Sequence, residues 1–581
     1  MFDRAGASRS PLVIGLSGHR NLHPGCEEQL AKAVRRYLDE LQKRMPQTEL
    51  RIMTGMAQGA DLLVAEVALQ AGLRVEAVLP LPLNEYLSDF DAPSADKLKS
   101  LLANENVHCT ELCLPASTVH PVARDAYYAN LTEILIDKCS LLLALWNGKT
   151  SPLPGGTADT LLRYLSARTQ DAQHDRQIVM VPAGAEDSWG QHFVYWIPTP
   201  RTDSESATVG VASYLTCIGE DMLAVHDRMP AELDRQLGEL NAYNAEFAQL
   251  FGKRSIRSTD SLLAALPAGT ALGDDASLRL IDTEYAKADA LAIYNQQRSN
   301  RMFRWFSFVA FLMALLFLVY AKLLPSTVLL SAYLAMLVIS FCVFFWIRKR
   351  HWFARHLIYR VLAETMRTKF FLRVASAEEK VDAAELMHLA GVTQFSGYGW
   401  IGAILKNITP LNAARTALPE EESVRLSFVR QHWIRDQQTY FKSRVKKLER
   451  THVRLERMKR ALIYALAALT LLLVLFSHTL REIHAAGAVT LKDISIFIMG
   501  LLPVWMGIWE LYQNKMATRE LLWQYRNQLS HFSRADLQLS RSHVRKRDRS
   551  ILVVVGKASL MESYLWTIHR FHREHEPPTA G

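Results

Sequence analysis

Long hydrophobic runs dominate the pattern of apolar and polar positions along this chain. Residues 306–324 and 327–347 are almost entirely apolar, and only Pro325 and Ser326 separate them. Each run is close to the roughly 20 residues that a helix needs to cross the hydrocarbon core of a bilayer. The pattern therefore predicts two membrane-spanning helices joined by a tight turn.

A second pair of apolar runs follows at residues 461–477 and 494–509. The last run contains Pro503, which membrane-spanning helices tolerate. We therefore expect an all-α membrane region with two transmembrane hairpins, at 306–347 and 461–511, and long cytosolic helices. Because the flanks of the two pairs are similar, the region is predicted to be a duplicated unit.

Basic residues at the outer ends of both pairs predict their orientation. Arg301 and Arg304 precede the first pair, and residues 348–351 after it are basic. The positive-inside rule then predicts a multi-pass membrane protein with both termini in the cytoplasm. Residues 1–10 contain no apolar leader, so the part before the first pair is expected to stay cytosolic.

The first 200 residues show a different pattern, in which short apolar runs alternate with amphipathic stretches. Strands are expected at 12–16, 50–53, 75–79, 107–112, 141–146 and 178–181, and helices at 25–43, 62–71, 95–103, 123–137 and 157–168. This alternation predicts an α/β domain with a doubly wound, Rossmann-like parallel sheet. From about Pro198 the strand pattern fades.

These patterns divide the chain into five parts. The parts are an α/β domain at 1–200, a helical extension and linker at 201–275, a first membrane unit at 276–380, a connector at 381–428 and a second membrane unit at 429–581.

Composition and charge agree with this division. The chain has 581 residues, of which 49% are hydrophobic and 22% charged, so it can hold a soluble part and a membrane part. Much of the +9 formal charge lies at 348–351, 442–460 and 541–549, beside membrane segments. Such residues fix topology and attract anionic lipid, so we expect no nucleic acid partner. The six scattered cysteines are interpreted as reduced packing residues, and no metal site is predicted.

Three glycine-bearing turns, 15–20, 54–61 and 148–159, follow predicted strands, and ligands bind such sheets at the carboxyl ends of their strands. Gly155, Gly156 and Thr157 open a helix whose first N–H groups suit a phosphate. The candidate ligand-binding residues are Gly15, Ser17, Gly18, His19, Arg20, Thr54, Gly55, Met56, Gly59, Asp61, Gly155, Gly156 and Thr157. The alternative is that these glycines only make tight turns, and that His19 only packs or bonds within its turn.

The turns also carry a family resemblance. Gly15-Leu16-Ser17-Gly18-His19-Arg20, Thr54-Gly55-Met56-Ala57-Gln58-Gly59-Ala60-Asp61 and Gly155-Gly156-Thr157-Ala158-Asp159 resemble the SLOG superfamily of Rossmann-like domains, over roughly residues 10–200. The resemblance implies a pocket for a nucleotide-derived ligand.

The LOG-type phosphoribohydrolases are one branch of that superfamily, and their glycine-rich loop contains a third glycine followed by a glutamate. This chain has neither, because Thr157, Ala158 and Asp159 follow Gly156. The resemblance therefore favours a sensor over an enzyme, and no catalytic residue is predicted. Asp61 and Asp159 could act as a general acid or base, or could accept ribose hydroxyls or cap helices.

The membrane units resemble the SLATT family of two-transmembrane domains, most closely at residues 433–441. Together the two resemblances imply a bacterial inner-membrane effector of anti-phage defence. In it, a cyclic nucleotide or ADP-ribose derivative would bind the SLOG-like domain, and a homo-oligomer would then form or open a pore. No cofactor is expected beyond that nucleotide. The alternatives are a membrane-anchored nucleotide N-glycosidase and a non-catalytic membrane scaffold.

Overall fold

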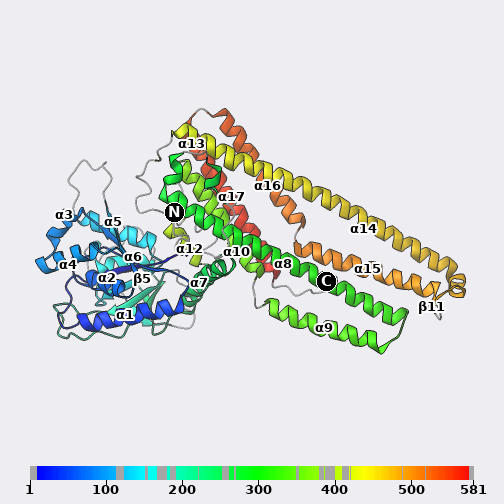
Figure 1. The fold of residues 1–581 in the computed structure, drawn as a ribbon, viewed down its shortest axis with the longest axis horizontal. Coiled ribbons are helices and arrows are strands. Elements are labelled where there is room, and N and C mark those ends of the chain that lie inside the picture. The colour runs from blue at the N-terminus through cyan, green and yellow to red at the C-terminus, as the bar shows by residue number, and fades with distance from the viewer. Residues whose placement is uncertain are drawn as a thin grey trace. The chain divides into compact units, whose positions relative to one another are not determined.

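The computed structural model divides the chain into two compact units. The first contains Met1–Ser255 and Val381–Ala417, and the second contains Ile256–Lys380 and Leu418–Gly581. The structure describes residues 9–112, 124–150, 155–166, 179–183, 192–219, 222–251, 261–266, 270–348, 352–377, 385, 399–408, 418, 421–486, 489–516, 518–542 and 544–574. Both units are drawn in Figure 1.

A nine-stranded sheet forms the centre of the first unit. Its strands are β1 (Leu12–Gly18), β2 (Leu50–Thr54), β3 (Arg74–Leu79), β4 (Val107–Glu111), β5 (Leu141–Trp146), β6 (Val179–Pro182), β7 (Val194–Pro198), β8 (Ser213–Gly219) and β9 (Met222–His226). Their order is β4-β3-β2-β1-β5-β7-β8-β9-β6. The pairs from β4 to β7 are parallel, whereas β8 is antiparallel to both of its neighbours. The structure thus has a strand at each of the six predicted positions.

Two predictions about this sheet are wrong. The sheet is mixed rather than purely parallel, and strands continue beyond Pro198, where β8 and β9 extend it. The strand β8 has buried residues on both faces, including the polar Ser213 and Thr216. It therefore lacks the alternation of apolar and polar residues that marks a half-exposed strand.

Helices cover the parallel half of the sheet. They are α1 (Glu27–Arg44), α2 (Ala60–Gln70), α3 (Leu83–Tyr86), α4 (Ala92–Leu102), α5 (Arg124–Lys138) and α6 (Thr157–Ser166). The helix α1 buries Leu30, Val34, Leu38 and Leu41, which recur at helical spacing. Every residue of β5 is buried, as expected for a central parallel strand with both faces covered.

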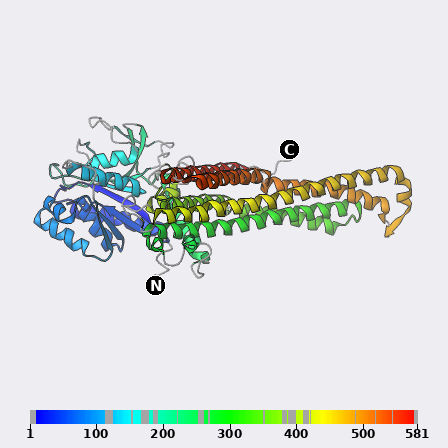
Figure 2. The ribbon, with the colours of Figure 1, turned by 90° about the horizontal axis from the view of Figure 1, so that it is seen from above.

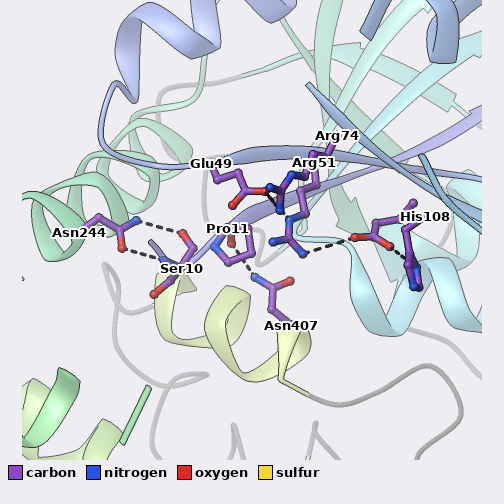
Figure 3. Close-up of polar contacts among 9 residues, drawn as sticks. Ser10, Pro11, Glu49, Arg51, Arg74, His108, Asn244 and Asn407 are labelled. Atoms are coloured by element: carbon purple, nitrogen blue, oxygen red, sulfur yellow. Dashed lines mark hydrogen bonds and ion pairs between the residues drawn. The ribbon is translucent and has the colours of Figure 1, made fainter. Parts of the chain in front are cut away.

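Two later helices, α7 (Ala231–Phe251) and α12 (Gly399–Asn407), also belong to the first unit. Asn244 of α7 donates to the carbonyl oxygen of Ser10 (3.0 Å), and Asn407 of α12 donates to that of Pro11 (2.6 Å), as Figure 3 shows. The rings of Tyr243 and Trp400 lie 5.1 Å apart. The first unit therefore continues beyond residue 200, the expected end of the α/β domain. It also includes α12, which lies in the segment expected to be a connector.

The second unit is helical. Its helices are α8 (Ala276–Lys322), α9 (Thr327–Arg348), α10 (Trp352–Val374), α13 (Glu422–Val429), α14 (Asp436–Glu482), α15 (Leu491–Met516), α16 (Thr518–Arg541) and α17 (Arg545–Glu574), with a π-helical turn, Arg430–Arg435, before α14. The four predicted apolar runs lie in α8, α9, α14 and α15. By length and composition these four helices are able to cross a membrane, and almost none of the residues in their apolar stretches is buried.

These four helices pack against one another. The neighbouring pairs are α8 with α9, α8 with α15, and α14 with α15, and the views in Figures 1 and 2 agree on this arrangement. A Cβ added to Gly500 of α15 would lie 3.2 Å from Leu318 of α8, so these two helices approach closely. The structure thus indicates membrane association through four apolar helices.

Candidate functional site

The strand order places the candidate site where the sheet changes direction. From β1 the chain proceeds outward through β2, β3 and β4, and then returns to β5 on the other side of β1. Ligands of such sheets bind beyond the carboxyl ends of the strands at this switch point. The three predicted turns leave the sheet there, because Gly18 ends β1, Thr54 ends β2 and Trp146 ends β5.

The first and second turns are in direct contact. The backbone N–H of Ala60 donates to the carbonyl oxygen of His19 (3.1 Å). Gly59 has a φ of +85°, and a Cβ there would lie 2.1 Å from the carbonyl oxygen of Arg20. A side chain at Gly59 would therefore require both a disfavoured backbone conformation and separation of the two turns.

His19 joins the first turn to the third. Its backbone N–H donates to the carbonyl oxygen of Leu145 (3.1 Å), and its ring Nε2 accepts the N–H of Asn147 (3.0 Å). The second bond assigns the proton of the neutral ring to Nδ1. Burial lowers the pKa of His19. His19 therefore bonds within its own turns, as in the alternative interpretation of this residue.

Asp61 fixes the second turn. Its Oδ2 accepts the Thr54 hydroxyl (2.9 Å) and the N–H of Ala57 (3.2 Å), while the Thr54 hydroxyl accepts the N–H of Met56 (3.0 Å). Thr54 and Asp61 are both buried, and Met56 has a φ of +55°. Burial raises the pKa of Asp61 to about 6. The carboxylate thus holds a strained turn in place.

A cluster that the sequence analysis missed adjoins the first turn. The guanidinium of Arg20, which is exposed, lies 4.9 Å from the ring centre of Tyr128 in α5. The Tyr128 hydroxyl donates to Asp89, and Arg124 forms an ion pair with Asp89 (2.8 Å). Sequence reasoning missed Tyr128 because it stands in a helix without a distinguishing pattern.

The third turn reaches the same cluster. Gly155 has a φ of +73°, and a Cβ there would lie 2.9 Å from the Cβ of Tyr128. Its N–H donates to Oδ2 of Asp159 (2.8 Å), so Asp159 caps the start of α6. The Asp159 carboxylate therefore already accepts one of the N–H groups expected to bind a phosphate. Residues 151–154 of this turn lie outside the described residues.

The predicted residues thus divide into two groups. Gly18, His19, Arg20, Gly59, Gly155 and the turn from Thr54 through Gly55 and Met56 to Asp61 come together at the carboxyl edge, and Gly156 and Thr157 adjoin them at the start of α6. Gly15 lies within β1, where a Cβ would be 2.5 Å from the Sγ of Cys139. It therefore serves packing. Ser17 is buried in the same strand.

Arg20 places an exposed positive charge at this edge, which suits an anionic ligand. Among the described residues, no group of three or more His, Cys, Asp or Glu side chains could hold a metal ion. A surface hollow of about 650 Å³ lies elsewhere, over α1 and α2, and includes none of the predicted site residues. Comparison with protein-family models found no match, and comparison with curated proteins also found none.

Proposed function

We propose that this protein is a bacterial membrane effector controlled by a nucleotide-derived second messenger. The first unit binds the messenger at the carboxyl edge of β1, β2 and β5, with Arg20 facing its phosphate. The second unit forms or opens a pore in a homo-oligomer, which depolarises the membrane, and the setting is anti-phage defence. Four spanning helices are too few for a wide pore, so several copies are required.

One observation above all supports coupling between the two functions, and it concerns α5. Near one end, α5 carries Tyr128 beside Arg20. At its other end, Nζ of Lys406 in α12 donates to the carbonyl oxygens of Ile136 (3.1 Å) and Cys139 (2.8 Å). In the chain, α12 stands between α10 and α13 of the second unit. We propose that a ligand that moves α5 acts on the second unit through α12, because the chain joins α12 to both of these helices.

The energy for opening must come from a difference in affinity. A messenger shifts a closed–open equilibrium only as far as it binds the open state more tightly. Moving the equilibrium from 1:99 to 99:1 requires about 5.5 kcal/mol. Several occupied sites in one oligomer share this free energy, so each site needs to bind the messenger only modestly more tightly in the open state than in the closed state.

The test is dye leakage from liposomes that contain the full-length protein, with a panel of cyclic nucleotides and ADP-ribose derivatives. The site variant is Arg20→Met, which removes the charge but keeps a long apolar stem. The matched control is Arg35→Met on α1, where Arg35 pairs with Asp39 on the surface. Thermal unfolding of the same samples reports binding separately, since ligand at 100 times its Kd adds about 2.7 kcal/mol.

The expected result is that one nucleotide raises both unfolding temperature and leakage in the parent and the Arg35→Met control, and that Arg20→Met loses both. Binding without leakage would contradict the pore. If no nucleotide shifts the unfolding temperature, the scaffold alternative stands instead.

A membrane-anchored N-glycosidase is the second candidate, favoured by the pKa of about 6 for Asp61, which suits a general acid. Against it, Asp61 already accepts two hydrogen bonds from its own turn. Release of free base from nucleoside monophosphates by the full-length protein, abolished by Asp61→Asn, would favour the enzyme.

A further inference from the structure

A row of arginines stands on α14 just before its apolar run. Arg450, Arg454 and Arg457 follow one another at spacings of four and three residues, so they lie on one face of the helix, and all three are exposed. The same spacing continues to Ala461 and to Tyr464, which is 72% exposed. We call this surface, from Arg450 to Tyr464, the arginine face.

The three guanidinium groups have no partner in the described part of the chain. Neighbouring charges on the same helix are paired: Glu449 forms an ion pair with Arg526 of α16 (2.6 Å), and Lys459 forms one with Glu510 of α15. The chain thus supplies counter-charges on either side of the arginine face but none to it. A positive surface of this kind suits a partner that brings negative charge.

Apolar side chains lie among the arginines. Val453 is 46% exposed and Met458 is 40% exposed. Together with the three arginines, Glu449 and Ala461, they line a shallow hollow of about 620 Å³. The surface therefore offers both cationic groups and an apolar floor, which matches a phospholipid better than a free inorganic anion.

The position of the arginine face along α14 also fits a bilayer surface. At 1.5 Å per residue, Arg457 precedes Ala461 by about 6 Å and Arg450 precedes it by about 16 Å. The headgroup layer is roughly 5–8 Å thick, and arginine side chains extend toward it. Lys442, Lys446 and Lys447 stand about 21–28 Å away, farther from the apolar run than any of the three arginines.

We propose that the arginine face binds the phosphate groups of anionic phospholipids in the leaflet that α14 enters first. The planar guanidinium fork matches phosphate oxygens, Val453 and Met458 contact the glycerol and upper acyl region, and Tyr464 lies at the interface. A second copy of the same face is a poor occupant, because like charges would meet. This lipid site does not depend on the proposed nucleotide messenger.

The experiment measures lipid retention by the full-length protein in detergent, using native mass spectrometry with phosphatidylglycerol or phosphatidylcholine. The variant is Arg450→Gln/Arg454→Gln/Arg457→Gln. The matched control, Lys442→Gln/Lys446→Gln/Lys447→Gln, removes three exposed charges from the same helix farther from the membrane. Sedimentation of each sample gives the subunit number, and circular dichroism checks folding.

We expect the parent and the lysine control to prefer phosphatidylglycerol with affinities within about twofold of each other. The arginine variant should bind it at least tenfold more weakly, since each basic residue near the surface contributes about fivefold. If the arginine variant fails to fold, Arg454→Gln alone should show about that fivefold loss. Equal losses in both triple variants, no preference over phosphatidylcholine, or full competition by inorganic phosphate would overturn the proposal. A change in subunit number of the arginine variant, with its lipid retention unchanged, would also overturn the proposal.

Discussion

The strand β5 and the helix α9 contain the same kinds of residue in opposite surroundings. All six residues of β5 are buried by the rest of the first unit. None of the residues in Thr327–Trp346 of α9 is buried. Apolar surface left exposed on this scale indicates an external cover, and a run of this length is long enough for that cover to be a bilayer. The strand β5 is thus stabilised by burial within its own chain, whereas α9 leaves its apolar surface open to its surroundings.

Polar groups differ in a similar way between the candidate site and the arginine face. At the candidate site, Thr54 and Asp61 form a hydrogen bond with each other, and His19 accepts one from the backbone of the third turn. These bonds hold the edge in place before any ligand arrives. On the arginine face of α14, Arg450, Arg454 and Arg457 have no partner among the described residues. Closed hydrogen bonding fixes geometry, whereas unpaired exposed charge favours an external anion.

The largest expected effect is a cavity in the first unit. Leu143→Ala in β5 removes a fully buried side chain, so we expect a loss of about 2–5 kcal/mol in the free energy of unfolding. Urea unfolding of the detergent-solubilised full chain, followed by pulse proteolysis and detection of peptides from the first unit, measures this loss. A loss below about 1 kcal/mol would mean that β5 is not part of a packed core.

Next is the pH dependence from Asp61. Its folded pKa of about 6 lies above the ordinary value of about 3.9, so the protonated form is favoured in the folded state. The contribution of Asp61 to the free energy of unfolding is fully present below about pH 4 and is lost as the pH rises through about 6. The full change is about 3 kcal/mol.

The variant Asp61→Asn stays neutral, and its amide oxygen still accepts the Thr54 hydroxyl. Relative to this variant, the parent should lose about 2.5 kcal/mol of first-unit stability between pH 4 and pH 7.5. The same urea measurement at the two pH values checks this. Parallel stability curves for the two proteins would refute it.

A smaller effect is expected at the attachment of α12. Lys406→Met keeps the stem of a buried side chain but leaves the carbonyl oxygens of Ile136 and Cys139 without their donor. We expect a loss of about 2 kcal/mol in the first unit, and faster hydrogen exchange in the peptide covering α12. Unchanged exchange there would show that Lys406 does not hold α12 to the sheet.

The smallest expected effect comes from a leucine-to-alanine change in the second unit, which matches Leu143→Ala in the first unit. Leu337 of α9 is 44% exposed, and lipid is as apolar as leucine. Leu337→Ala should therefore change the unfolding free energy of the protein in phosphatidylcholine nanodiscs by less than about 1 kcal/mol. A loss as large as that of Leu143→Ala would show that α9 packs against protein rather than lipid.

The sequence by itself predicted the features that depend on local pattern. Four apolar runs of sufficient length indicated four membrane-length helices, because length and composition alone set that property. Alternation of short apolar and amphipathic stretches indicated an α/β unit with strands at six of nine positions. The glycine turns could be assigned to one sheet edge, since parallel strands joined by helices all end there.

Only the tertiary structure decided the features that depend on contacts between distant residues. Asn407 bonds to Pro11 across 396 residues and brings α12 into the first unit, a pairing that no local pattern encodes. Tyr128, Asp89 and Arg20 come from three different segments and meet only once the sheet has formed. The strands β8 and β9 lack an alternating pattern because both of their faces are buried, so only their neighbours identify them. Local patterns report whether a side chain prefers water, and the folded chain alone determines which partner it meets.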